Sequence, residues 1–89
     1  MPKKMMYRKI GSVPNVKVFK PVGGSSLEEV VLTLDEYEAL RLGELSNLKQ
    51  KQAANRMWIS QPTFNRILSS ARKKIALAII TGKQIRIER

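Results

Sequence analysis

The sequence has neither cysteine nor histidine in its 89 residues. Their absence removes disulfides, the usual zinc ligands, and the Cys-His and Ser-His pairs that activate a catalytic nucleophile. The chain also has no apolar run near the roughly 18 residues that a membrane span requires. We therefore expect a protein that is not an enzyme and that has no catalytic residues, no metal site, no cofactor and no membrane partner.

Acidic residues are missing from most of the chain. Residues 1–27 contain six bases and residues 45–87 contain nine, and neither range has an acid. The seven acids are Glu28, Glu29, Asp35, Glu36, Glu38, Glu44 and Glu88, and the formal net charge is +10. Because a field of one sign attracts polyanions, this distribution favours nucleic acid as the partner over an anionic membrane or an acidic protein surface.

The length suits one small domain, in which we distinguish two segments. Residues 1–27 are predicted to form a basic N-terminal arm with a short strand at 15–21, where apolar and polar residues alternate. Residues 28–89 are predicted to form a mainly helical domain. Short strands are expected on either side of its helices, at 29–32 and within 82–88.

The first helix is predicted to span 34–45. Thr33 and Glu36 have the spacing of a capping box, in which each side chain bonds the backbone amide of the other residue. The apolar face expected at helical spacing consists of Leu34, Tyr37, Leu40 and Leu45, with Ala39 and Leu42. The acids of this helix are expected to lie on its opposite, solvated face.

Two further helices are predicted after it. The second begins at a Ser46 or Asn47 cap and ends near Met57, and its paired alanines allow another helix to approach closely. The third begins at a Ser60 cap and ends before Gly82, with a proline at its second position, where the missing amide proton has no cost.

The turn between these two helices is predicted at 57–59. A short helix, a turn of about three residues, a polar cap and a longer helix are the pattern of a helix-turn-helix. Trp58 stands where glycine is common, because the chain there tends to need a positive φ. Two interpretations of Trp58 stay open: a core or subunit-contact residue, and an indole that rests on the DNA backbone.

The third helix carries the candidate reading residues on the face opposite its apolar stripe. Gln61 and Asn65 have the side-chain type that pairs with adenine, and Arg66 has the type that pairs with guanine. No acid lies on this face to repel phosphate. The residues that we expect to contact phosphates are Lys49, Gln50, Lys51, Ser60, Ser69, Arg72 and Lys73.

The sequence resembles an uncharacterised prokaryotic family of small predicted DNA-binding proteins. The stretches that carry the resemblance are EEVVLTLDEYEALRL (28–42), QAANRM (52–57), SQPTFNRILSSARKKIA (60–76) and GKQIRIE (82–88). The family's helix-turn-helix is similar to region 4 of bacterial sigma factors. The resemblance implies a three-helix core of the winged-helix superfamily, and a recognition helix that carries Gln61, Thr63, Asn65 and Arg66. Many relatives have a cysteine near the start, and any role of that residue does not transfer to this chain.

Together these features predict a cytoplasmic, nucleoid-associated transcription regulator that binds double-stranded DNA sequence-specifically. The first alternative is a protein-interaction adaptor that contacts RNA polymerase, since sigma region 4 also touches the polymerase. The second is an RNA-binding module, although only five residues are aromatic and an aromatic sheet surface is not indicated.

A homodimer is also predicted. Residues 75–80 are apolar on every side of the last helix, and such a helix must be covered on every side. The cover for Leu77 and Ile80 is either a twofold partner, which is the commonest arrangement of oligomers, or the three predicted strands of the same chain.

Overall fold

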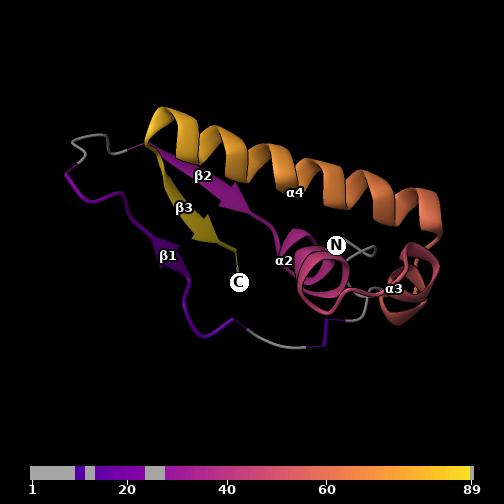
Figure 1. The fold of residues 1–89 in the computed structure, drawn as a ribbon. Coiled ribbons are helices and arrows are strands. Elements are labelled where there is room, and N and C mark those ends of the chain that lie inside the picture. The colour runs from indigo at the N-terminus through magenta and orange to yellow at the C-terminus, as the bar shows by residue number, and fades with distance from the viewer. Residues whose placement is uncertain (1–9, 12–13, 24–27, 89) are drawn as a thin grey trace, which may run out of the picture.

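A computed structural model describes residues 10–11, 14–23 and 28–88, which form a mainly helical fold with one small sheet (Figure 1). The prediction of a basic arm falls largely on residues outside these ranges. The described helices are α2 (Leu34–Leu40), the π-helical turn η1 (Arg41–Leu45) that continues it, α3 (Gln50–Arg56) and α4 (Gln61–Thr81). The described strands are β1 (Val18–Phe19), β2 (Glu29–Leu32) and β3 (Gln84–Ile87).

The three strands form a sheet in the order β1-β3-β2. Strand β3 is antiparallel to β1 and parallel to β2, with Val30 opposite Ile85. Two parallel neighbouring strands need a long connection between them. In this chain every described helix lies between β2 and β3 and forms part of that connection. The strands predicted at 29–32 and within 82–88 are confirmed, whereas the strand predicted at 15–21 is reduced to two residues.

Helix α4 runs along the whole molecule, over the sheet at its C-terminal end and beside α2 and α3 toward its N-terminal end (Figure 1). Its 21 residues correspond to about 32 Å at 1.5 Å per residue. Phe64 and Leu68 close one core cluster with η1 and α3, and Ala71 closes a second with the sheet. The helix begins at a Ser60 cap and ends at Gly82, whose φ is 69°, as predicted.

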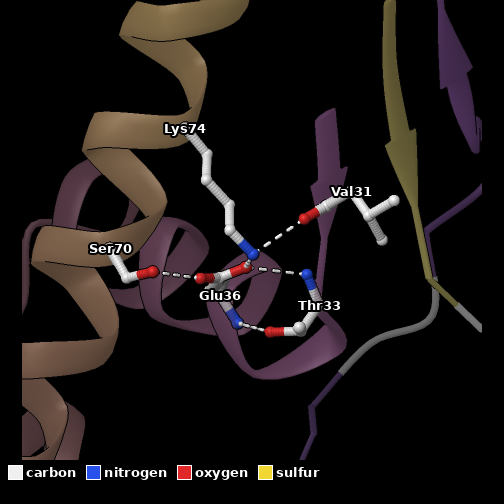
Figure 2. A network of polar contacts seen from close by, with 5 residues as sticks. All are labelled: Val31, Thr33, Glu36, Ser70 and Lys74. Atoms are coloured by element: carbon white, nitrogen blue, oxygen red, sulfur yellow. Dashed lines mark hydrogen bonds and ion pairs between the residues drawn. The ribbon is translucent and has the colours of Figure 1, made fainter. Parts of the chain in front are cut away.

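The predicted capping box at the start of α2 is confirmed. The Glu36 amide donates to the Thr33 hydroxyl at 3.1 Å, and the Thr33 amide donates to the Glu36 carboxylate at 2.8 Å (Figure 2). The same carboxylate accepts hydrogen bonds from Ser70 and Lys74 of α4, at 2.5 and 2.9 Å. Lys74 also donates to the carbonyl of Val31 at 2.8 Å. One side chain therefore joins the start of α2 to α4, and Lys74 extends the connection to β2.

The acids of α2 do not form the solvated face that we expected. Asp35, Glu36 and Glu38 are only 5%, 5% and 1% exposed. The Glu38 carboxylate accepts from Arg41 Nε at 2.9 Å and Nη2 at 2.7 Å, and from the amide of Gly11 at 2.7 Å. The expectation was wrong because helical periodicity does not reveal the groups that a tertiary fold brings to a carboxylate.

The first helical segment ends at Leu45 as predicted, but the placement of Leu45 on the core side and the predicted start of the second helix need correction. Leu45 is 83% exposed, because the π-helical turn shifts its direction away from the core. Ser46 closes η1 and Asn47 has a φ of 58°, and the residue that precedes the next helix is Lys49. Helix α3 begins at Gln50, and the Lys49 amide donates to the side chain of Gln52 at 3.2 Å.

Candidate nucleic-acid interface

The candidate interface is formed by α3, the turn that follows it, and the first turns of α4. Trp58 adopts a φ of 59°, so this turn has the left-handed conformation that its sequence position suggested. The Ile59 amide donates to the carbonyl of Ala54 at 3.1 Å and closes the turn. Trp58 is 66% exposed, so its interpretation as a core residue is wrong. Its neighbour Met57 is fully buried and supplies the core contact instead.

The predicted reading residues lie together on the exposed side of α4. Gln61, Asn65 and Arg66 are exposed, and Thr63 is half-buried. The Thr63 hydroxyl accepts from Arg66 Nη2 at 3.2 Å and from the Ser60 hydroxyl at 2.9 Å. Thr63 therefore supports the Arg66 guanidinium at the start of the helix.

The residues predicted to contact phosphates fall into two groups. Lys49, Gln50 and Lys51 are exposed at the start of α3, while Ser69, Arg72 and Lys73 are exposed along α4. The first group approaches the reading residues, since Gln61 Nε2 lies 3.5 Å from Gln50 Oε1. Ser60 is exposed but is already used as the cap of α4, because its hydroxyl accepts from the Thr63 amide at 3.3 Å.

An acid reaches this face, although the residues of α4 supply none. Glu44 of η1 accepts a hydrogen bond from Arg72 Nε and forms an ion pair with the same guanidinium. The side chains are 46% and 57% exposed, respectively. Arg72 was predicted to contact a phosphate, but its guanidinium is already paired with the Glu44 carboxylate. A phosphate would therefore have to compete with that carboxylate.

Ion pairs divide the bases of residues 45–87 into two sets. Besides Arg72, the paired bases are Lys74, Lys83 and Arg86, which contact Glu36, Glu28 and Glu29. Among residues 45–87, all of which the structure describes, the bases that form no ion pair are Lys49, Lys51, Arg56, Arg66 and Lys73. These five lie on or next to α3 and α4, around the candidate reading residues, whereas the other described bases without an ion pair, Lys17 and Lys20, lie near β1.

The described residues can also be compared with the requirements of a metal site and of a membrane-spanning helix. No group of three or more acids lies close enough there to hold a metal ion. None of the helices in the same ranges has the length and apolar character needed to cross a membrane.

Sequence comparisons relate the whole chain to known proteins. The model of a family described as "Protein of unknown function DUF134" matches residues 1–89. UPF0251 protein TTE1845 of Caldanaerobacter subterraneus subsp. tengcongensis is 52% identical over 99% of this chain and 76% of the relative. UPF0251 protein Teth514_1147 of Thermoanaerobacter sp. is 50% identical over 99% of this chain and 80% of the relative. A UPF0251 protein of Chloroherpeton thalassium is 47% identical, and the match covers 60% of its length. No solved structure matches the chain.

Proposed function

The chain belongs to the DUF134 family, whose matched relatives are named UPF0251 proteins, and we propose that it is a sequence-specific double-stranded DNA-binding regulator of transcription. This family is the uncharacterised prokaryotic family that the sequence was found to resemble. The family description assigns no function, so the proposal rests on the geometry of α3 and α4. In this proposal the two helices are a helix-turn-helix similar to sigma region 4, and the protein is located in the cytoplasm on the nucleoid.

One observation carries the proposal most directly. The exposed face at the start of α4 combines Gln61, Asn65 and Arg66, and the five bases of residues 45–87 that form no ion pair lie on the same helix, on α3 and at its cap. Amide and guanidinium groups read base edges in the major groove, and lysines near them bind phosphates. A solvated helix face needs neither this choice of side chains nor this separation of charges.

Two other functions use the same surfaces. An adaptor for RNA polymerase needs an exposed protein-binding face and does not require affinity for naked duplex. An RNA-binding module needs affinity for single strands or for the shallow groove of an RNA helix. Direct binding measurements with DNA duplex, RNA duplex and single strands of matched length separate the three functions.

Duplex binding is expected to depend strongly on salt. If the bases around the reading residues neutralise about five phosphates, log K should fall with log salt at a slope of about −4.5. Fluorescence anisotropy of a labelled random-sequence duplex, titrated at several salt concentrations, measures this slope. Removing the charges of Lys49 and Lys51 should make the slope shallower by roughly 0.9 per charge.

The matched control for this experiment is Lys20→Ala. Lys20 is exposed but lies beside Ile79 and Gly82, at the opposite end of α4 from the reading residues. Its removal should leave the slope near the wild-type value. If the affinity of the wild-type protein for duplex does not change with salt, the electrostatic argument is contradicted. If removing the charge of Lys20 changes the salt slope as much as removing the charge of Lys51, the attraction arises from net charge alone.

The protein is also proposed to act as a homodimer. Leu77, Ile79 and Ile80 of α4 are 47%, 72% and 82% exposed, so the strands of the same chain do not provide the cover that the monomer alternative required. A second copy can bury these side chains. A twofold dimer also presents two reading helices to half-sites about 34 Å apart, one turn of DNA.

Replacing Ile80 with lysine is expected to convert the dimer into a monomer, because a charge in an apolar interface is left without a partner. Sedimentation velocity at micromolar concentration measures the change in mass. Leu45→Lys is the control, since Leu45 is as exposed as Ile80 but lies on η1. A wild-type protein that sediments as a monomer at every concentration refutes the dimer.

A further inference from the structure

Glu44 is held close to the reading helix by the packing of η1. Its neighbour Gly43 lies so near α4 that a Cβ there would sit 3.3 Å from side-chain atoms of Phe64 and Leu68. The Gly43 backbone therefore packs directly against the core-facing side of α4. The next residue, Glu44, accepts a hydrogen bond from Arg72. This close approach brings the backbone that carries Glu44 next to α4.

Arg72 shares a face with the candidate reading residues. It follows Asn65 by seven residues, almost two full turns, so the two side chains leave α4 in nearly the same direction. Their neighbours on this face are polar or basic. Glu44 is thus a carboxylate on a surface that is otherwise suited to phosphate, and exposed ion pairs of this kind contribute little to folding stability.

The other acids of the chain have different surroundings. Asp35, Glu36 and Glu38 are buried within the fold, and Glu28 and Glu29 pair with Lys83, just before β3, and with Arg86 of β3. Among the described residues, Glu44 is therefore the acid that pairs with a base of the proposed DNA interface.

Resting on the proposed function, we propose that Glu44 is a selectivity residue that restrains binding to DNA of the wrong sequence by acting through Arg72. A loosely docked, non-specific complex is held by phosphate contacts that release counterions. While Glu44 holds the Arg72 guanidinium, that charge is not available to such a complex without breaking the pair. In the specific complex α4 lies in the major groove. Arg72 then contacts the DNA from the position in which the Glu44 carboxylate holds its guanidinium.

The test is the substitution Glu44→Gln, which keeps the shape of the side chain and removes its charge. The expected result is a roughly three- to ten-fold gain in affinity for a random-sequence duplex, with a salt slope steeper by about 0.9, because Arg72 is released to a phosphate. The affinity for the selected target duplex should rise by a smaller factor. The ratio of specific to non-specific affinity therefore falls.

The double substitution Glu44→Gln with Arg72→Gln separates this mechanism from simple repulsion. If Glu44 acts through Arg72, the double variant binds random duplex as the single Arg72→Gln variant does, with the same salt slope. Glu44→Gln can instead raise the affinity of the Arg72→Gln variant for random duplex by the same factor as it raises the affinity of the wild type. In that case Glu44 repels phosphate directly, and the inference is overturned.

Two further outcomes separate this inference from the function on which it rests. Wild-type protein that binds duplex, together with a Glu44→Gln variant of unchanged non-specific affinity and unchanged slope, overturns the role of Glu44 alone. Absence of duplex binding by the wild-type protein overturns the proposed function and the role of Glu44 together. Thermal unfolding of each variant verifies that the differences arise in the folded protein.

Discussion

Glu36→Ala is expected to lower the free energy of unfolding by about 2–4 kcal/mol, because it removes one side of a buried ion pair and half of a capping box. The carboxylate bonds the Thr33 amide, the Ser70 hydroxyl and the Lys74 ammonium, and its side chain is 7% exposed. The Lys74 side chain is 33% exposed, so water relieves part of the loss and keeps it below that of a fully buried pair. Urea unfolding followed by circular dichroism measures the change.

The matched control is Glu29→Ala. Glu29 also pairs with a base, Arg86, at 2.9 Å, but the side chains of that pair are 33% and 45% exposed. Its loss should have a small effect, since exposed pairs contribute little. Similar losses for the two variants would contradict the view that the Glu36 contacts hold α2 against α4 and β2.

The pH dependence of stability gives a second readout of the same network. Burial raises the pKa of Glu36, but hydrogen bonds from Lys74, Ser70 and the Thr33 amide outweigh it and hold the pKa below its ordinary value of 4.5. A lowered folded-state pKa gives stability above the unfolded pKa, and this stability is lost as pH falls through the folded pKa. The difference in stability between the wild type and Glu36→Gln should therefore shrink as the pH falls below about 4.5.

The ends of the helices were predictable where a local signal sets them. Thr33 and Ser60 are caps whose partners lie three residues away, and Gly82 takes a positive φ that glycine adopts without strain. The turn at Trp58 was predictable for the same reason, because its conformation depends on a few neighbouring residues. These features were correct because they require no knowledge of distant parts of the chain.

The errors lie where distant groups decide the outcome or where the helix departs from regular α-helical geometry. Glu36 is buried because Ser70 and Lys74 approach from α4, more than thirty residues away. Leu45 had the right spacing for the core, but the π-helical turn changed the phase of the helix before it. Periodicity assumes a constant angle per residue, and it fails where that angle changes.

The candidate interface was predictable in its residues but not in its electrostatics. Periodicity placed Gln61, Asn65 and Arg66 on the exposed side of α4, where the structure also has them. The contact between Glu44 and Arg72 depends on how η1 packs against α4. A count of charges along the sequence therefore overstates the positive charge open to phosphate, because four bases in the apparently acid-free range are paired with acids from outside it.

Arg66→Ala is expected to cost about 1–3 kcal/mol of binding free energy on the preferred duplex and to relax the preference at one base pair. The reason is that a guanidinium directed at a base edge discriminates between bases, whereas a charge near a phosphate does not. Lys73→Ala is the matched control, since Lys73 is exposed on the same helix and forms no ion pair among the described residues. It should weaken all duplex sequences about equally and make the salt slope shallower by roughly 0.9.

The contact between Arg66 and Thr63 refines this prediction. Arg66 Nη2 donates to the Thr63 hydroxyl at 3.2 Å, so the guanidinium is partly oriented before DNA binds. Thr63→Val keeps the shape of the side chain and removes the acceptor, and it should lower the sequence preference less than Arg66→Ala does. Selection of bound duplexes from a random pool, followed by sequencing, measures the preference of each variant. If Arg66→Ala leaves both affinity and preference intact, α4 is not the reading helix, and the adaptor function becomes the better account of its exposed face.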